Sequence, residues 1–252
     1  MVEFMGRFRD YAPYNNMLVR VQNPSCGFYA TAKDWHKRFG RSIKEDARPM
    51  LILAPMHPVM VVYDLDQTTG REVPTELLRF AQFDGQWEPR WLERLVENAG
   101  RHRIRVDFKK LSSTNAGFAT FSDPQVGEKM RIAIHADLPA PSRFGILCHE
   151  MAHILLGHLG SDEDHWWPSR SHLGRGPIEV EAEATAYIVT RQLGLDGASA
   201  AYVSRYLGKQ AEVPKRVSFD MIAKVAGQVK DMALRLQPVP LTKAERKQRR
   251  SR

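Results

Sequence analysis

The chain is poor in cysteine and has no long apolar run. Its two cysteines, Cys26 and Cys148, lie far apart and form no CxxC pair, so we expect neither a disulfide framework nor a cysteine-only zinc site. No stretch approaches the roughly 18 apolar residues that a membrane span needs. The segment from Met1 to Asp10 lacks the apolar centre of a signal peptide. We therefore expect a cytoplasmic protein that binds no membrane.

Acidic residues are fewer than basic ones, and the excess of basic residues is concentrated in the last part of the sequence. The formal net charge of the 252 residues is +8, with 37 Lys and Arg against 29 Asp and Glu. The last ten residues hold six basic residues against Glu245 alone, which is more than half of the excess. We predict that residues 238–252 form a disordered basic tail. Such a tail either keeps the chain in solution or contacts nucleic-acid phosphates.

The pattern of the first third predicts a small α/β module, residues 1–70. Two amphipathic helices are expected over Tyr14–Gln22 and Thr31–Phe39, the first with Asn15 and Asn16 as possible caps. The apolar runs Met50–Ala54 and Val59–Tyr63 flank a proline-containing turn and predict a hairpin.

We expect residues 71–237 to form a larger domain. Its pattern predicts both strands and helices, so the expected fold class is α+β. The expected strands are Ile104–Leu111, Met130–Asp137 and, more weakly patterned, Ala116–Phe121. The expected helices span residues 75–82, 88–99, 144–159, 177–192, 198–207 and 217–236.

The segment HEMAH, residues 149–153, has the spacing of a metal site. Residues four apart on a helix share one face, so His149 and His153 can direct both imidazoles at one ion. Glu150 can then take a proton from a water on that ion. The motif supplies two ligands and a base for Zn²⁺. A seam of buried structural histidines is the alternative interpretation.

A catalytic zinc ion needs a third protein ligand and an open position. His158 fails the extended HExxHxxGxxH spacing, because Leu156 and Leu159 occupy the glycine and histidine positions. His165 and His172, in the loop that follows, remain alternatives.

The next helix offers a better third ligand. Glu179 and Glu183 are four apart and share a face, whereas Glu181 points nearly the opposite way. We assign Glu179 as the ligand and Glu183 as the carboxylate that orients a histidine. Glu181 stays open as the alternative ligand. An acidic first turn favoured by the helix dipole is the structural alternative for the three carboxylates.

The expected strand Met130–Asp137 directly precedes the helix that carries the HEMAH motif. As an edge strand it could pair with an extended peptide and present it to the metal. Tyr187, His165 and His172 are candidates for stabilising the carbonyl oxyanion, and the sequence does not choose among them.

Residues 148–159 (CHEMAHILLGHL) and 178–195 (IEVEAEATAYIVTRQLGL) resemble the ImmA/IrrE family of zinc metallopeptidases. The resemblance implies a zincin-like, gluzincin-type domain in which His149, His153 and Glu179 bind zinc and Glu150 is the base. Glu183 stands where that family often has Asn or Asp.

The N-terminal module is similar to that of ArdC-type antirestriction proteins. The matching segments are residues 14–18, 22–24, 32–35, 39–41 and 47–55. This resemblance implies binding of single-stranded DNA.

Basic and aromatic residues in the same region fit such binding, since phosphate contact and base stacking use this mixture. The basic candidates are Arg20, Lys33, Lys37, Arg38 and Arg41; the aromatic ones are Tyr14, Phe28, Tyr29 and Trp35. The alternative is an aromatic core beneath an ordinary basic surface.

Together these patterns predict a zinc-dependent metalloendopeptidase that cleaves a specific regulatory protein. The alternative is an antirestriction or regulatory protein that binds single-stranded DNA and whose zinc site is structural or regulatory. The sequence does not predict an oligomeric state.

Overall fold

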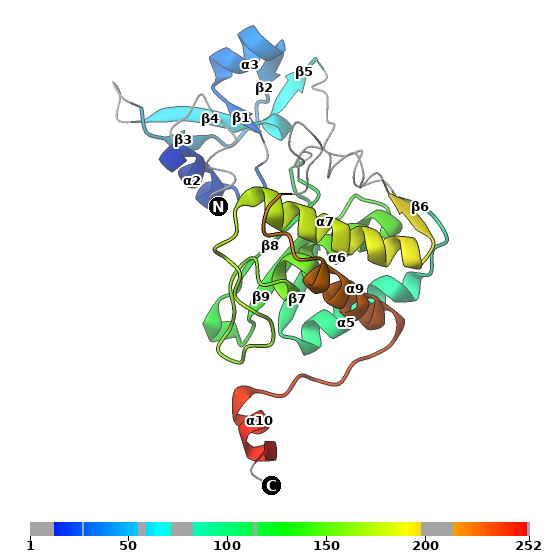
Figure 1. The fold of residues 1–252 in the computed structure, drawn as a ribbon. Coiled ribbons are helices and arrows are strands. Elements are labelled where there is room, and N and C mark those ends of the chain that lie inside the picture. The colour runs from blue at the N-terminus through cyan, green and yellow to red at the C-terminus, as the bar shows by residue number, and fades with distance from the viewer. Residues whose placement is uncertain are drawn as a thin grey trace. The chain divides into compact units, whose positions relative to one another are not determined.

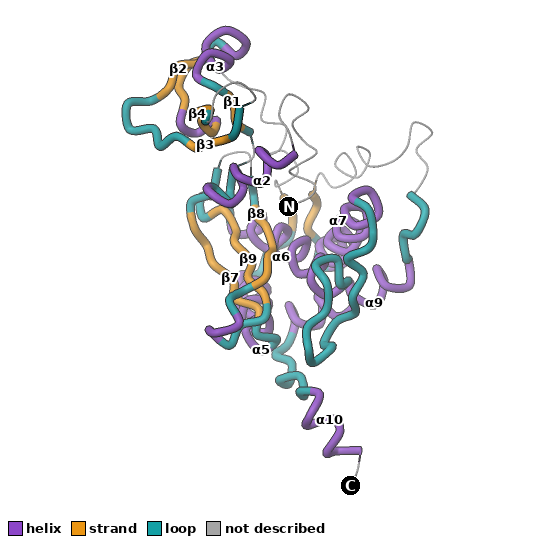
Figure 2. Tube along the Cα trace, turned by 90° about the vertical axis from the view of Figure 1, so that its left-hand side faces the viewer, coloured by secondary structure: helices purple, strands orange, loops and turns teal. Residues whose placement is uncertain are grey.

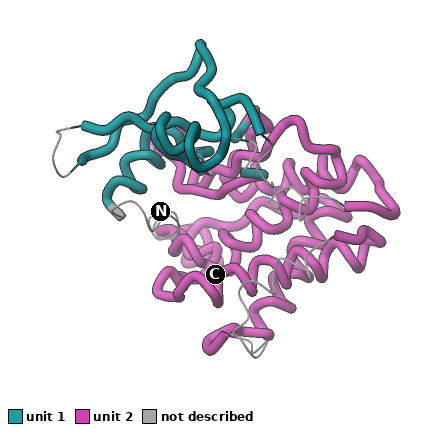
Figure 3. Tube along the Cα trace, turned by 90° about the horizontal axis from the view of Figure 1, so that it is seen from above, with its two compact units in different colours: residues 1–78, 111–116 teal, residues 79–110, 117–252 magenta. Residues whose placement is uncertain are grey.

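The computed structural model describes residues 13–26, 28–54, 59–71, 83–112, 115–197 and 214–250. The chain divides into two units, each considered by itself: residues 1–78 with 111–116, and residues 79–110 with 117–252 (Figure 3). Both contain helices and strands, so the fold is mixed α+β, as the sequence predicts. The predicted helices over 75–82 and 198–207 lie outside the described residues. Among the described residues, no helix is long and apolar enough to cross a membrane.

Unit 1 consists of short elements around two small sheets (Figure 1). Its elements are α2 (Pro13–Gln22), β1 (Tyr29–Ala30), α3 (Ala32–Phe39), β2 (Arg41–Ile43), β3 (Met50–Ile52), β4 (Met60–Asp64), the 3-10 turn η1 (Leu65–Gln67) and β5 (Thr68–Gly70). The sheet order is β1-β4-β3, and β2 pairs with β5. The predicted hairpin is confirmed, because β3 and β4 are antiparallel with Met50 opposite Val62.

Helix α3 shows why the sequence folds locally as it does. The Thr31 hydroxyl accepts a hydrogen bond from Asp34 N and caps the helix start. Gly40 ends it in the left-handed conformation, at φ 62°. Between them, Trp35 is fully buried and its indole donates to the carbonyl of Tyr63 at 2.9 Å. The helix therefore packs its aromatic face into the core of unit 1.

The expected capping role of Asn15 and Asn16 is wrong, because α2 already begins at Pro13. Asn15 instead pairs with the backbone of Leu53: its Nδ2 donates to the carbonyl at 2.7 Å and its Oδ1 accepts from the amide at 2.9 Å. Gln22 makes the same double contact with Leu51, at 2.8 Å each. Two side-chain amides thus pair with the outer edge of the chain at Leu51 in β3 and at Leu53 just after it.

Unit 2 contains a three-stranded sheet covered by helices (Figures 1 and 2). Its strands are β6 (Phe83–Gly85), β7 (Ile104–Lys109), β8 (Gly117–Phe121), β9 (Met130–His135) and β10 (Leu195–Gly197), with the 3-10 turn η2 (Pro124–Val126). The sheet order is β7-β9-β8, with β7 parallel and β8 antiparallel to β9; β10 pairs with β6. Strand β9 is therefore central, and the expectation that it is an edge strand is wrong. Among the described strands of this sheet, β8 holds the antiparallel edge.

The helices of unit 2 are α5 (Pro89–Arg101), α6 (Ala140–Leu155), α7 (Arg175–Gln192), α9 (Phe219–Leu234) and α10 (Lys243–Arg250). Helix α6 packs on β8, β9 and α7, while α9 packs on α5 and α7. The apolar residues of α6 are almost all buried, Leu147 and Met151 completely. The metal motif thus lies on a helix that is enclosed on several sides.

The division between the two units follows residue 78, and residues 111–116 belong to unit 1. One reason is that the Ser112 hydroxyl donates to Asp64 Oδ1 at 3.1 Å. Where composition alone predicts a disordered tail, the structure describes helix α10.

Candidate metal centre

Helices α6 and α7 bring three ligand atoms together. His149 Nε2 lies 3.1 Å from His153 Nε2 and 3.8 Å from Glu179 Oε2. Ligand atoms about 2.0–2.1 Å from one tetrahedral zinc ion are separated by about 3.3 Å, so these spacings fit a single small cation. The three ligand atoms all lie within 4.8 Å of one another, and this is the one group of three or more such residues in the described chain.

The outer nitrogen of His149 is held by a carboxylate. His149 Nδ1 donates to Glu183 Oε2 at 2.9 Å, so in the neutral ring the lone pair is on Nε2, the atom that faces Glu179. Both carboxylates come from the same face of α7, as their four-residue spacing predicts. Burial lowers the pKa of His149, but the hydrogen bond and charge of Glu183, with Glu150 and Glu179, raise it to about 9. This cluster of carboxylates therefore favours a positive charge at the site.

His153 is held by a chain of buried groups that the sequence did not reveal. Its Nδ1 lies 3.0 Å from His158 Nδ1, and His158 Nε2 lies 2.9 Å from Glu181 Oε2. Because a carboxylate only accepts hydrogen bonds, His158 donates through Nε2 and accepts from His153 through Nδ1. The lone pair of His153 is thereby fixed on Nε2, where a metal would bind. Burial, with His149 and His158 nearby, keeps the pKa of His153 well below its ordinary value.

The fully buried Glu181 ends this series of hydrogen bonds in an ion pair with Arg170, whose side chain is 15 % exposed. Arg170 donates to both of its oxygens, at 2.7 and 2.6 Å, and Ser218 N donates to Oε1 at 2.7 Å. Burial raises the pKa of Glu181, but the hydrogen bonds from His158, Arg170 and Ser218 lower it to about 2. Every oxygen of Glu181 is committed to a donor. The structure thus places Glu181 behind His158 and away from the group of three ligand atoms.

The base candidate Glu150 is buried at 8 % exposure beside the edge strand β8. A Cβ atom on Gly117 of that strand would lie 2.6 Å from Ile146 Cγ2 and 3.6 Å from Glu150 Cγ. Only a residue without a side chain allows the strand to approach α6 so closely. The absence of a side chain at position 117 thus brings the backbone of β8 next to Glu150.

The remaining candidates are partly or largely exposed, except for Cys148. His165 and His172 are exposed, and neither belongs to the group of three ligand atoms. Tyr187 is 42 % exposed. Cys148 is fully buried, and burial raises the pKa of its thiol, as expected for a small apolar residue.

In unit 1 the proposed base-stacking surface needs correction. Tyr29 and Trp35 are buried, at 1 % and 0 % exposure, so they belong to the core and cannot stack on bases. Phe28 contacts Trp35 edge-on, with ring centroids 5.4 Å apart. The aromatic core that the sequence left as an alternative is what the structure contains, although Tyr14 is 53 % exposed.

The basic candidates of unit 1 differ in their exposure and in their contacts. Lys33, Lys37 and Arg38 lie on α3 and are exposed. Arg41 is structural, since its guanidinium donates to the hydroxyl and carbonyl of Thr68 at 2.7 and 2.9 Å. Arg20 is half-buried.

Comparison with known proteins gives two solved structures of the antirestriction protein ArdC from the R388 plasmid, one metal-free and one bound to Mn(II). Their sequence identities to this chain are 15 % and 18 %, and the TM-score is 0.36 for both. Each match covers 88 % of this chain and 85 % of the other. No protein-family model and no curated protein matches the sequence. Inferences about function therefore rest on this chain's own residues.

Proposed function

We propose that unit 2 is a metal-dependent hydrolase of zincin-like type, with Zn²⁺ as its ion and a peptide bond as its substrate. The observation that carries the proposal is the convergence of His149, His153 and Glu179 from two helices, with Glu150 next to the first ligand. Each histidine has its outer nitrogen engaged and its Nε2 directed at the same point. A purely structural pair of histidines does not require this arrangement.

The chain's own residues define the chemistry. When bound, a divalent ion supplies a Lewis acid that polarises a carbonyl and lowers the pKa of a coordinated water. Glu150 removes a proton as the water oxygen bonds to the carbonyl carbon, and returns it to the amide nitrogen as the C–N bond breaks. The edge strand β8 offers backbone beside Glu150 against which an extended peptide could align.

Glu150→Gln tests this proposal, because it removes the proposed base and leaves the three proposed metal ligands unchanged. We expect the variant to retain bound metal, measured by mass spectrometry of the purified protein, and to lose peptide hydrolysis. Hydrolysis is measured as new N-termini released from a proteome-derived peptide library. His149→Ala is the matched variant that loses both. Wild-type turnover by Glu150→Gln would rule out the mechanism, and a wild-type protein that binds no divalent metal would rule out the centre itself.

A second candidate is an antirestriction protein that binds single-stranded DNA through unit 1. The observation that favours it is the exposed basic row on α3, where Lys33 and Lys37 lie one turn apart beside Arg38. Lys33→Glu with Lys37→Glu should weaken binding of a labelled single strand and reduce its salt dependence. Unchanged binding in that variant would eliminate the α3 surface.

A further inference from the structure

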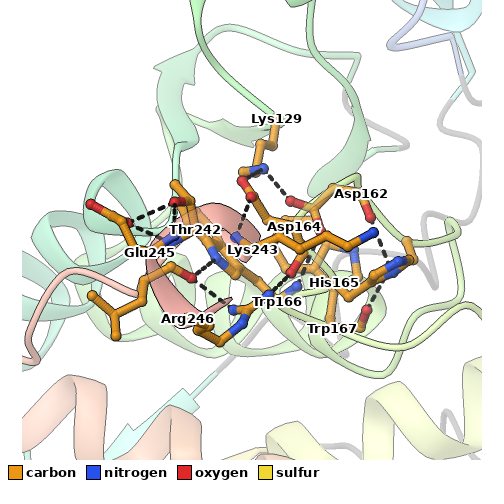
Figure 4. Close-up of polar contacts among 12 residues, drawn as sticks. Lys129, Asp162, Asp164, His165, Trp166, Trp167, Thr242, Lys243, Glu245 and Arg246 are labelled. Atoms are coloured by element: carbon orange, nitrogen blue, oxygen red, sulfur yellow. Dashed lines mark hydrogen bonds and ion pairs between the residues drawn. The ribbon is translucent and has the colours of Figure 1, made fainter. Parts of the chain in front are cut away.

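The C-terminal segment is attached to unit 2 at a defined place, the loop that follows the metal helix (Figure 4). The indole of Trp166 donates to the carbonyl of Leu241 at 2.9 Å. Asp164 Oδ1 accepts from the amide of Lys243 at 2.9 Å, and the guanidinium of Arg246 donates to the carbonyl of Asp164. These contacts fix the start of α10, although the segment contains few apolar residues.

Two acidic residues at this attachment point share one lysine of the same unit. Lys129 forms ion pairs with Asp162 and Asp164, the second at 2.7 Å. Its side chain is only 8 % exposed, and its ammonium lies 4.4 Å from the ring centroid of Trp166. Asp164 thus binds both the buried ammonium of Lys129 and the backbone amide of Lys243, the first residue of α10. Asp164 therefore anchors the segment through the amide of Lys243 while its charge is paired with Lys129 inside unit 2.

Helix α10 carries five basic residues and Glu245 as its one acid. That acid is committed to the helix start, since Glu245 Oε2 accepts from the amide and hydroxyl of Thr242 at 2.7 and 2.8 Å. These hydrogen bonds lower the pKa of Glu245, so it stays ionised in this role. Lys243, Lys247 and Arg249 are exposed. A short helix with a net positive charge therefore stands on the surface of unit 2.

We propose that α10 is a docking surface for the phosphate backbone of a nucleic acid, separate from the metal centre and from the basic row on α3. An eight-residue helix is about 12 Å long, so its net charge amounts to about one positive charge every 3 Å. A DNA strand carries a phosphate about every 3.4 Å along its axis, a closely similar charge density. A membrane surface is the poorer partner, because a helix that lies on lipid needs an apolar face and α10 has only Ala244.

The test uses the full chain with Lys247→Glu and Arg249→Glu, titrated with a labelled single strand and with the matching duplex at several salt concentrations. We expect the affinity to fall on the order of tenfold at low salt, and the salt slope to fall by about 1.4 for the single strand, since each phosphate contact contributes about 0.7. The neutral pair Lys247→Gln and Arg249→Gln should show a smaller loss in the same direction. Thermal unfolding of both variants, measured alongside the titrations, checks that the fold is retained.

The matched control is Lys215→Glu with Lys224→Glu, which makes the same change of net charge at exposed positions elsewhere in unit 2. It should leave affinity and salt slope unchanged. A loss on either nucleic acid that is specific to the α10 variants supports the proposal. An unchanged slope in those variants, or an equal loss in the control, overturns it. The Lys33→Glu, Lys37→Glu variant reports separately on unit 1.

Discussion

At the scale of single residues, the position of the proposed metal depends on groups that never touch it. His153 is oriented by His158, which is oriented by Glu181, which is held in turn by Arg170. A partner of this kind fixes both the tautomer and the ring orientation of a ligand. The buried groups His158 and Glu181 matter as much as the ligands, because their hydrogen bonds decide which nitrogen of His153 is available to a metal.

Glu181→Gln should lower the affinity for zinc about 10–100-fold, the usual cost of losing an outer partner of a metal ligand. The amide leaves Arg170 without its charge partner, so we also expect a loss of about 3–5 kcal/mol in the free energy of unfolding, as for a broken buried ion pair. Competition with a chromophoric chelator measures the affinity. Glu163→Gln, an exposed carboxylate on the same loop as Arg170, is the control. If Glu181→Gln binds zinc like the wild type, the orienting role of Glu181 is wrong.

Asp64 provides a residue-scale prediction for unit 1. Burial, with Asp66 nearby, raises its pKa from 3.8 to about 6, although hydrogen bonds from Cys26, Asp66 N and Ser112 oppose the rise. The folded state therefore holds the proton more tightly than the unfolded state. The corresponding stability is fully present below pH 3.8 and is lost as the pH rises through about 6.

We expect the free energy of unfolding of unit 1 to fall by about 3 kcal/mol across this range from the Asp64 contribution. Asp64→Asn should remove that slope. Denaturant unfolding at a series of pH values measures it, and the slope is the readout because the substitution also disturbs the hydrogen bond from Asn23. A variant with the wild-type slope would contradict the assignment.

At the scale of elements, one glycine links the metal helix to the loop that supports it. Gly157 follows α6 with φ 78°, and a Cβ atom there would lie 2.0 Å from the carbonyl oxygen of Pro168. Its own carbonyl accepts from Arg170 N at 2.8 Å. The close approach of these two backbone segments is what allows Arg170 to reach Glu181.

Gly157→Ala should therefore destabilise unit 2 by several kcal/mol and weaken zinc binding. Gly127→Ala is the matched control, because Gly127 has a similar φ of 72° but nothing within 4 Å of its added Cβ. The control should cost only the left-handed strain of about 1–2 kcal/mol. Thermal unfolding of the two variants separates conformational strain from steric clash. Equal losses would mean that the contact with Pro168 is unimportant.

How much the sequence could predict differs between elements. The HEMAH helix and the β3–β4 hairpin follow from local periodicity, and the four-residue spacing of Glu179 and Glu183 places both on one face. The support of His153 does not follow, because Arg170 comes from an irregular loop without a periodic pattern. The central place of β9 was missed for a similar reason: β7 and β8 pair with it through contacts between distant segments. The burial of Trp35 depends on packing throughout unit 1, so local sequence alone could not show that its ring is unavailable for base stacking.

At the scale of the whole molecule, the two units should respond to different conditions. The proposed ion binds only residues of unit 2, whereas Asp64 lies in unit 1. A ligand that binds the native state stabilises it by about 2.7 kcal/mol at 100 times its dissociation constant.

Added zinc should raise the unfolding temperature of unit 2, and a chelator should reverse the effect. His149→Ala should abolish the response while leaving the pH-dependent transition of unit 1 in place. Differential scanning calorimetry with and without zinc, on the wild type and this variant, follows both transitions. A zinc-dependent shift that survives in His149→Ala would place the ion elsewhere.

The amide pairs of Asn15 and Gln22 have a consequence for self-association. An outer strand with unpaired backbone groups is a template on which another chain can add a strand. Here the groups of Leu51 and Leu53 are already occupied by carboxamides, although both leucine side chains are exposed, at 49 % and 52 %. The two amides make the hydrogen bonds that the backbone of a neighbouring strand would otherwise make, and they offer no backbone edge to a further strand. These two side chains should therefore hinder another chain from adding a strand at this edge.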